Sequence, residues 1–271
     1  MSIISKYAYY AYSSFELLAG IKNWRTLFPL FFSRHPAEIS WLELRKGGTR
    51  MAVRGSMDAW SVKESMIDRF YSRHGMQILP PWVVVDIGAA IGEFTVLAGQ
   101  KASSGQVYAF EPNPNSLKIL NQNLIANNLT NVHTFELGVW SRPCQLCLNL
   151  EGGEPLQAQS LQGGTSKQQL SFQAITISDI INEITKKPID LLKLDCEGAE
   201  YEILLSCNAE TLTQLKRIVM EYHDLGGQKT HLTLEKFLTG QGFHIYSQVN
   251  PVHAEIGYLY AQRAEQTIKP D

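Results

Sequence analysis

The chain has 271 residues, of which 44% are hydrophobic, and its formal net charge is −2 at pH 7. This length and apolar content predict a globular chain with a sizeable core. Because lysines and arginines are scattered along a slightly negative chain, nucleic acid is not expected as a main partner, and a small molecule fits better.

Neither a membrane span nor a signal peptide is expected. No stretch has the length and apolar character of a transmembrane helix. The charged residues Lys6, Glu16, Lys22 and Arg25 interrupt the first segment, which therefore lacks the apolar run of a signal peptide. The cytoplasm is the expected location.

Two of the four cysteines, Cys144 and Cys147, lie close together in "CQLC". The stretch "CQLCLNL" alternates apolar and polar residues, so the two thiols would point to opposite faces of a strand. We therefore expect them to pack in a strand and not to bind zinc or form a disulfide.

Residues 1–80 differ from the rest and predict a helical and hairpin extension that caps a site. The first 32 residues carry Tyr, Phe, Leu and Trp at helical spacings. This indicates a packing helix, a lid or an amphipathic surface helix, with core packing favoured, and the segment could also pair two chains. Residues 41–55 predict a hairpin around a Gly-Gly turn, and residues 58–75 a helix that ends at Gly75.

Short apolar strands alternate with helical segments from Trp82 onward. This predicts a doubly wound α/β domain over residues 81–271, with a parallel sheet between two layers of helices. An antiparallel pair around a polar loop and a terminal hairpin are expected as well. The predicted parallel strands are 82–88, 106–111, 131–137, 189–195 and 217–223; the helices are 93–102, 113–128, 178–184 with Ser178 as its cap, 199–206 and one after 230; the antiparallel pair is 144–150 with 170–177.

Five of the predicted strands end in an acidic residue. Ligands of such sheets bind at the carboxyl ends of the strands, so these residues indicate where a site lies. They are Asp86, Glu111, Glu136, Asp195 and Glu221.

The stretch "VVVDIGAAIGEFT" places Gly88 and Gly92 in a strand-to-helix turn, where the backbone can approach a ligand and the helix start offers free N–H groups. Asp86, at the strand tip, suits a cationic amino group or a water network. Glu111, in "YAFEPNP", has the position from which a carboxylate accepts hydrogen bonds from both ribose hydroxyls. Together they predict an adenosine-containing cofactor. Glu136 is expected either to accept from the adenine amino group or to be a solvated strand end.

Three motifs, "VVDIGAAIGEFT", "VYAFEPNP" and "IDLLKLDCEGAEYEIL", resemble in order and spacing the S-adenosylmethionine-dependent methyltransferases of the FkbM type. The resemblance covers residues from about 41 to 263. It implies a Rossmann-like seven-stranded sheet with a reversed last strand (the class I methyltransferase fold), S-adenosylmethionine as donor, and a hydroxyl of a small molecule, natural product or sugar as acceptor. The resemblance implies that Asp86, Gly88 and Gly92 form the glycine turn of the family and that Glu111 binds the ribose. It also implies that Asp195, Glu197 and Glu200 form the acidic motif of the family.

Methyl transfer to a hydroxyl requires an aligned donor and acceptor and removal of a proton. The candidates for the base are Asp195, Glu197, Glu221 and His223. Strand alternation sends Glu221 and His223 to one face at the strand end, and an imidazole titrates near neutrality. Asp195 is expected to face the methionine part of the donor, and Glu200 to lie in the first turn of the next helix. Asp195, Glu221 and His223 could instead bind a divalent cation, but the metal-free reaction is favoured because no further ligand is apparent.

Two other classes of function stay open. A nicotinamide-dependent oxidoreductase could use a similar sheet, although the incomplete glycine fingerprint and the terminal hairpin disfavour it. A non-catalytic binding protein could retain the same fold.

Overall fold

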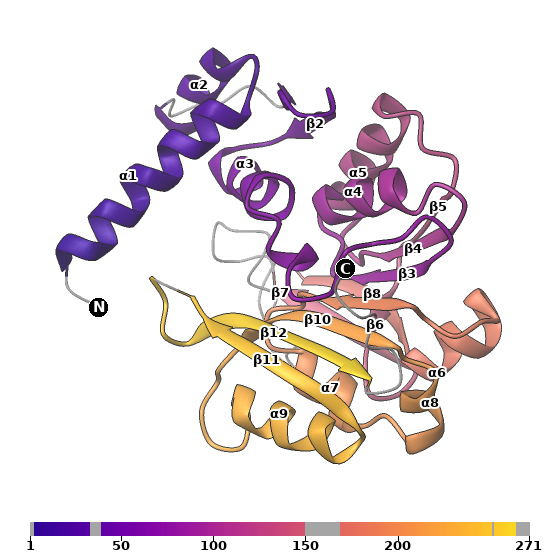
Figure 1. Cartoon of the computed structure of the whole chain (residues 1–271). Helices are drawn as coiled ribbons and strands as arrows, with labels where there is room; N and C mark the ends of the chain where they lie inside the picture. Colours follow the sequence, from indigo (N-terminus) through magenta and orange to yellow (C-terminus); the bar gives the residue numbers. More distant parts are fainter. Residues whose placement is uncertain (1–2, 33–38, 150–168, 251, 264–271) are drawn as a thin grey trace.

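A seven-stranded sheet forms the centre of the molecule (Figure 1). The computed structural model describes residues 3–32, 39–149, 169–250 and 252–263. The strand order is β11-β12-β10-β9-β3-β4-β5, and β12 runs antiparallel to both of its neighbours. The predicted doubly wound sheet with a reversed last strand is therefore confirmed. The strands are β3 (Val83–Ile87), β4 (Gln106–Phe110), β5 (Val132–Phe135), β9 (Leu191–Leu194), β10 (Arg217–His223), β11 (Phe243–Val249) and β12 (Ile256–Arg263).

Helices cover both faces of this sheet (Figure 1). One face carries α3 (Ser56–Val62), α4 (Glu93–Lys101) and α5 (Pro114–Ala126). The other carries α6 (Ile177–Asp179), α7 (Glu200–Leu205), α8 (Ala209–Thr213) and α9 (His231–Gly240). The central strands are buried on both faces, which explains why β3 and β9 are apolar except for Asp86 and Lys193, which pair with each other.

A separate core lies on each side of the sheet. Leu192, Leu194 and Met220 pack toward α7 and α9. Val84, Leu191 and Val219, which alternate with them along the strands, pack with aromatic residues of the segment before β3. On the latter face the register aligns Asp86, Lys193, Val219 and Tyr260 across four strands.

The N-terminal extension is helical with a hairpin. It contains α1 (Ile3–Gly20), a 3-10 turn (Trp24–Thr26), α2 (Leu27–Phe32) and the antiparallel pair β1 (Ser40–Glu43) and β2 (Arg50–Val53). Leu17, Ile21 and Leu30 are buried and join the core formed with α4 and α5. The favoured core packing therefore holds for one side of α1, while the other side exposes Tyr7 and Phe15.

The helix predicted over 58–75 is wrong in its second half. After α3 the backbone forms a π-helix (Lys63–Ile67), then turns and forms a 3-10 helix (Phe70–Ser72). The Asp68 carboxylate pairs with the buried Lys63 ammonium at 2.6 Å, and Arg69 adopts the left-handed conformation, which ends the helix without glycine or proline.

The helix predicted at 178–184 starts earlier. Its cap is Thr176 and not Ser178, because the Thr176 side chain accepts from the Asp179 N–H in a capping box. The helix continues as a π-helix (Ile180–Thr185). Helix α8 was not predicted from the sequence.

The predicted antiparallel pair is confirmed. It consists of β7 (Cys144–Asn149) and β8 (Gln169–Ile175), to which the short β6 (Gly138–Val139) adds a strand that the sequence did not indicate. Cys144 and Cys147 are both free thiols. The polar loop expected at 151–169 lies outside the described residues except for Gln169.

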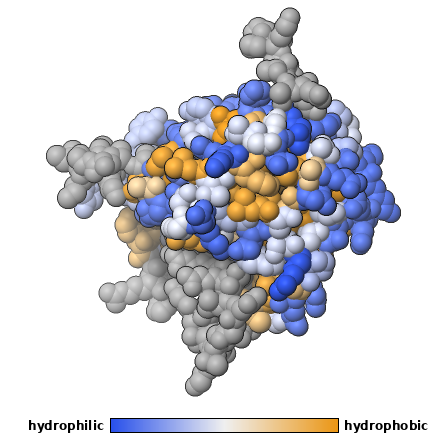
Figure 2. Space-filling view, turned by 90° about the horizontal axis from the view of Figure 1, so that it is seen from below, coloured by the Kyte–Doolittle hydropathy of each residue, from blue (hydrophilic) through white to orange (hydrophobic). Residues whose placement is uncertain are grey.

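Apolar side chains also gather on the outer surface seen from below, in the middle of a face that is otherwise largely hydrophilic (Figure 2). In the described part of the chain, no helix is long and apolar enough to cross a membrane.

Candidate active site

The strands that the sequence singled out end at the same level. Ile87 is paired with Phe110 on one side and with Leu194 on the other, and Leu194 is paired with Met220. The residues that follow are therefore neighbours along one edge of the sheet, in the order Glu136, Glu111, Gly88, Asp195 and Glu221, with Tyr258 opposite Glu221 on β12. We call this row, together with Asp86, Glu197 and His223, the acidic edge.

The glycine turn lies in the middle of the acidic edge. Gly88, Ala90 and Gly92 all have positive φ, at 74°, 47° and 86°. A Cβ at Gly88 would overlap the Asp195 carbonyl oxygen, and one at Gly92 would lie 2.8 Å from Leu120. Both glycines are thus required for packing against the protein itself, and not only for the approach to a ligand that the sequence suggested.

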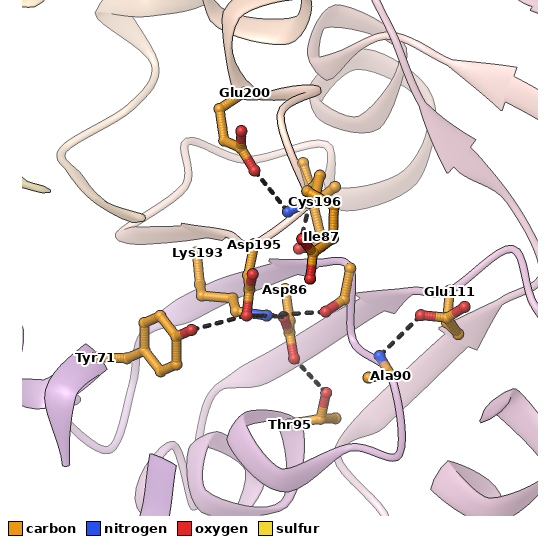
Figure 3. Close-up of polar contacts among 12 residues, drawn as sticks. Tyr71, Asp86, Ile87, Ala90, Thr95, Glu111, Lys193, Asp195, Cys196 and Glu200 are labelled. Atoms are coloured by element: carbon orange, nitrogen blue, oxygen red, sulfur yellow. Dashed lines mark hydrogen bonds and ion pairs between the residues drawn. The ribbon is translucent and has the colours of Figure 1, made fainter. Parts of the chain in front are cut away.

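Glu111 is fixed beside this turn. Its carboxylate accepts from the Ala90 N–H at 2.8 Å (Figure 3) and from the Asn113 N–H at 2.8 Å. Burial raises the pKa of Glu111 above its usual value, although these two donors oppose the shift. Each oxygen keeps a lone pair for a ligand hydroxyl. Glu136, by contrast, is exposed after β5.

Asp86 is fully buried, and the cation that pairs with it is Lys193 of the same chain. The Lys193 ammonium lies 3.0 Å from the Asp86 carboxylate, and Thr95 donates its hydroxyl to the same carboxylate (Figure 3). The ammonium also donates to the Gly88 carbonyl at 2.9 Å. Burial lowers the pKa of Lys193, but Asp86 and Asp195 outweigh this effect and raise the pKa above its usual value. Lys193 therefore stays charged and fixes the glycine turn to β9.

Asp195 keeps part of its carboxylate accessible. Its side chain is 23% exposed and lies 3.9 Å from the Lys193 ammonium. The Tyr71 hydroxyl donates to it at 2.8 Å (Figure 3). Tyr71 belongs to the segment before β3 and was not predicted to reach the site. A residue from the N-terminal part of the chain thus orients the Asp195 carboxylate.

The remaining residues of the acidic motif surround His223. The His223 imidazole lies 3.3 Å from the Glu197 carboxylate and 3.7 Å from that of Glu200. Burial alone would lower the pKa of His223, but Glu200 and Glu197 raise it to about 10. The two carboxylates thus favour the imidazolium form of the ring, which differs from the neutral imidazole that a base role requires.

Glu200 has a structural role. It is fully buried, and its carboxylate accepts from the backbone N–H groups of Cys196 and Gly198 at 2.7 and 2.9 Å. These bonds close the turn between β9 and α7, where Glu197 adopts a positive φ of 53°. Glu200 is the first residue of α7, in the first helical turn where the sequence placed it.

Three of these side chains form a group that could hold a metal ion if the His223 ring were neutral. Ligand atoms of Asp195, Glu197 and His223 all lie within 4.8 Å of one another. The set differs from the alternative drawn from the sequence, because Glu197 takes the place of Glu221. Carboxylate and imidazole ligands of this kind suit several divalent ions.

Three further groups at the acidic edge were missed by the sequence analysis. Glu64 accepts from the Trp60 indole N–H at 3.1 Å, and burial together with the charge of Asp195 raises its pKa to about 7. Burial likewise raises the pKa of Glu93 to about 8, although Lys193 opposes it. The buried Tyr258 hydroxyl has no hydrogen-bond partner among the described residues. Only Glu93, directly after Gly92 in the turn motif, could have been found from its position in the sequence.

Comparisons with known proteins agree with this geometry. A family model described as the methyltransferase FkbM domain matches residues 86–245, which is more than half of the chain. The chain is 26% identical over 255 residues to 31-O-demethyl-FK506 methyltransferase FkbM from Streptomyces tacrolimicus, covering 83% of this chain and 97% of that protein. It is 29% identical over 215 residues to methyltransferase sdnD from Sordaria araneosa, covering 68% and 81%.

A solved structure shares the fold. The crystal structure of methyltransferase FkbM from Methylobacillus flagellatus KT superimposes with a TM-score of 0.50 at 15% identity, covering 75% of this chain and 53% of that chain. The family match, the sheet with its reversed strand and the acid-flanked glycine turn agree, and the chain belongs to the FkbM family of methyltransferases.

Proposed function

We propose that the protein is an S-adenosylmethionine-dependent O-methyltransferase that acts on a hydroxyl of a small molecule, such as a natural product or a sugar. One observation carries the proposal: the glycine turn lies between two fixed carboxylates at the same level of the sheet, Glu111 on one side and Asp195 on the other.

The residues present fit an adenosine-containing sulfonium cofactor. Glu111 is held with lone pairs available for ribose hydroxyls. Asp195 is partly exposed and suits the cationic amino group of the methionine part. When bound, the cofactor supplies a methyl group on a positively charged sulfur. Lys193 already neutralises Asp86, so the partly exposed Asp195 remains to attract that positive charge.

The acceptor is inferred to be a hydroxyl. The relative from Streptomyces tacrolimicus is named for a 31-O-demethyl substrate. A hydroxyl must lose its proton, and Glu221 is the base that we favour among the predicted candidates, because burial and the charge of Asp195 raise its pKa above the usual value. His223 instead holds Glu197 in place as an imidazolium.

Residues 1–80 are proposed to cap the acceptor side of this site. Tyr71 reaches Asp195, and the charge of Glu64 acts on Glu221, although both residues lie before the matched family domain. These two interactions support the proposal that the extension forms part of the site.

The test is calorimetric titration of the full chain with S-adenosylmethionine, S-adenosylhomocysteine and NADH. We expect the first two to bind and NADH not to bind. Glu111→Gln should weaken S-adenosylhomocysteine binding roughly tenfold or more, because a charged hydrogen-bond acceptor is lost. Glu210→Gln, on the exposed side of α8, removes the same charge as a control. Lack of binding of both sulfur ligands to the wild type would contradict the proposal.

A further inference from the structure

A cavity of about 910 Å³ lies apart from the acidic edge. It lies between the segment before β3, the last turn of α4 and the outer strand β11. Its wall includes Arg69, Arg73 and His74 from the first of these elements, Lys101 from the second and Tyr246 from the third. None of the residues of the acidic edge lines it.

The charge of this cavity is of one sign. Arg69, Arg73 and Lys101 line it, and no acidic residue does so among the described residues. Within the same part of the chain, none of these three cations forms an ion pair with a carboxylate. Like charges held together repel one another, so the arrangement is costly unless an anion binds between them.

The backbone brings the basic side chains to one cavity. Arg69 and His74 flank the 3-10 helix Phe70–Ser72, and both adopt the left-handed conformation, at φ of 57° and 49°. The inner residues of this short helix, Phe70 and Tyr71, are buried against the sheet. Arg69, Arg73 and His74 all line the cavity, although they come from six consecutive residues.

Arg73 is held in place without losing its charge. Its guanidinium donates to the Asp68 backbone carbonyl at 2.8 and 3.2 Å and lies 4.3 Å from the centre of the Phe70 ring. A backbone carbonyl does not neutralise a cation. The fixed guanidinium therefore remains able to attract an anion, and a planar guanidinium suits phosphate oxygens.

An aromatic surface lies beside the cations. The His74 and Tyr246 rings stack with centroids 3.8 Å apart and an interplanar angle of 29°. Tyr246 is 49% exposed, so part of its ring is available to a ligand. Ser72 and two glutamines, Gln77 and Gln248, add neutral hydrogen-bonding groups to the cavity wall.

We propose that this cavity binds a phosphorylated small molecule, with its phosphate groups between Arg69, Arg73 and Lys101 and its organic part against the rings of His74 and Tyr246. The three cations match a phosphate group of charge −2 or greater better than a single carboxylate. The volume lies within the range of small-molecule sites. The concave shape favours a small molecule over an extended polyanion.

The proposed site is independent of methyl transfer. Helix α4 begins at the glycine turn and carries Lys101 in its last turn, so the two sites lie toward opposite ends of the helix. Failure of one proposal would leave the other untouched.

The test is calorimetric titration of the full chain with pyrophosphate, which lacks an adenine that could enter the cofactor site. We expect binding by the wild type that weakens as salt is added. Arg69→Gln and Lys101→Gln should each raise the Kd for pyrophosphate about tenfold. The control Lys118→Gln, an exposed position on α5, should leave the Kd unchanged while removing the same charge.

A second arm separates the possible sources of phosphate. Vesicles of phosphatidylglycerol mixed with phosphatidylcholine are sedimented with the wild type and with Arg69→Gln. We expect no sedimentation of either protein with vesicles. Vesicle binding that Arg69→Gln abolishes would assign the cavity to a lipid headgroup and overturn the proposal. It is also overturned if millimolar pyrophosphate does not bind, or if Arg69→Gln and Lys101→Gln bind it as the wild type does.

Discussion

The acidic edge lies toward one end of α4, and the cavity lined by Arg69, Arg73 and Lys101, here called the basic cavity, lies toward the other. The two regions concentrate charges of opposite sign. At the acidic edge the deepest carboxylate, Asp86, is compensated by a buried lysine of the same chain. In the basic cavity, no described carboxylate pairs with Arg69, Arg73 or Lys101. The net charge of −2 is therefore the sum over two regions of opposite charge. The net charge of the whole chain does not indicate which ligands an individual site binds.

The largest effect is expected for the buried cation of the acidic edge. Lys193→Met leaves Asp86 buried without its partner and should lower the free energy of unfolding by about 4 kcal/mol. Lys216→Met, which breaks the partly exposed pair with Asp190, should cost less than about 1 kcal/mol. Urea unfolding measures both, and equal losses would contradict the special role of Lys193.

A smaller effect concerns Glu93. Its folded pKa of about 8 lies above the ordinary value of 4.5, so the folded state binds more protons than the unfolded state between these values. The stability that this proton binding provides is present below pH 4.5 and is lost as pH rises toward 8. Glu93→Gln should therefore flatten the fall in unfolding free energy over this range, measured by urea unfolding at several pH values. A slope identical to that of the wild type would exclude the effect.

A contact of Tyr71 links the segment beside the basic cavity to the acidic edge. Tyr71→Phe removes the hydrogen bond to Asp195 and should reduce stability by about 1 kcal/mol. S-adenosylhomocysteine affinity should fall with it, because Asp195 loses its orientation. Tyr246→Phe, an exposed tyrosine on β11, controls for loss of a hydroxyl. Unchanged affinity in Tyr71→Phe would show that the contact does not position Asp195.

The smallest effect is expected in the cavity. Arg69→Gln should change the unfolding free energy by less than about 0.5 kcal/mol, because no ion pair of Arg69 with a described carboxylate is lost. Thermal unfolding without and with pyrophosphate measures it. A large loss without ligand would mean that Arg69 supports the fold and would weaken the contrast with Lys193.

Most of the sheet could be predicted from the sequence, because buried parallel strands are continuous apolar runs with clear boundaries. The exact match of β10 to the predicted 217–223 is an example. The helix over 58–75 failed because its break depends on the Lys63–Asp68 pair and on a left-handed Arg69, neither of which has a signature such as glycine.

Some residues of the candidate site could likewise be predicted from the sequence, and others could not. Glu111, Asp195 and Glu221 were found because position at a strand end is a local property of the sequence. Tyr71 and Glu64 were missed because their partners lie on distant strands and no spacing rule connects them. The charge state of His223 was also inaccessible, since it depends on Glu197 and Glu200 approaching the ring in three dimensions.

The ion pair between Lys193 and Asp86 also has a kinetic consequence. The two residues come from adjacent strands that are 107 positions apart in the chain, and the contact between Tyr71 and Asp195 spans 124. Closing loops of this length is slow, because the chain loses conformational entropy before the contacts that stabilise the closed loop can form. During synthesis, Asp86 emerges well before its lysine, so the first half of the chain must await β9 before this buried carboxylate is neutralised.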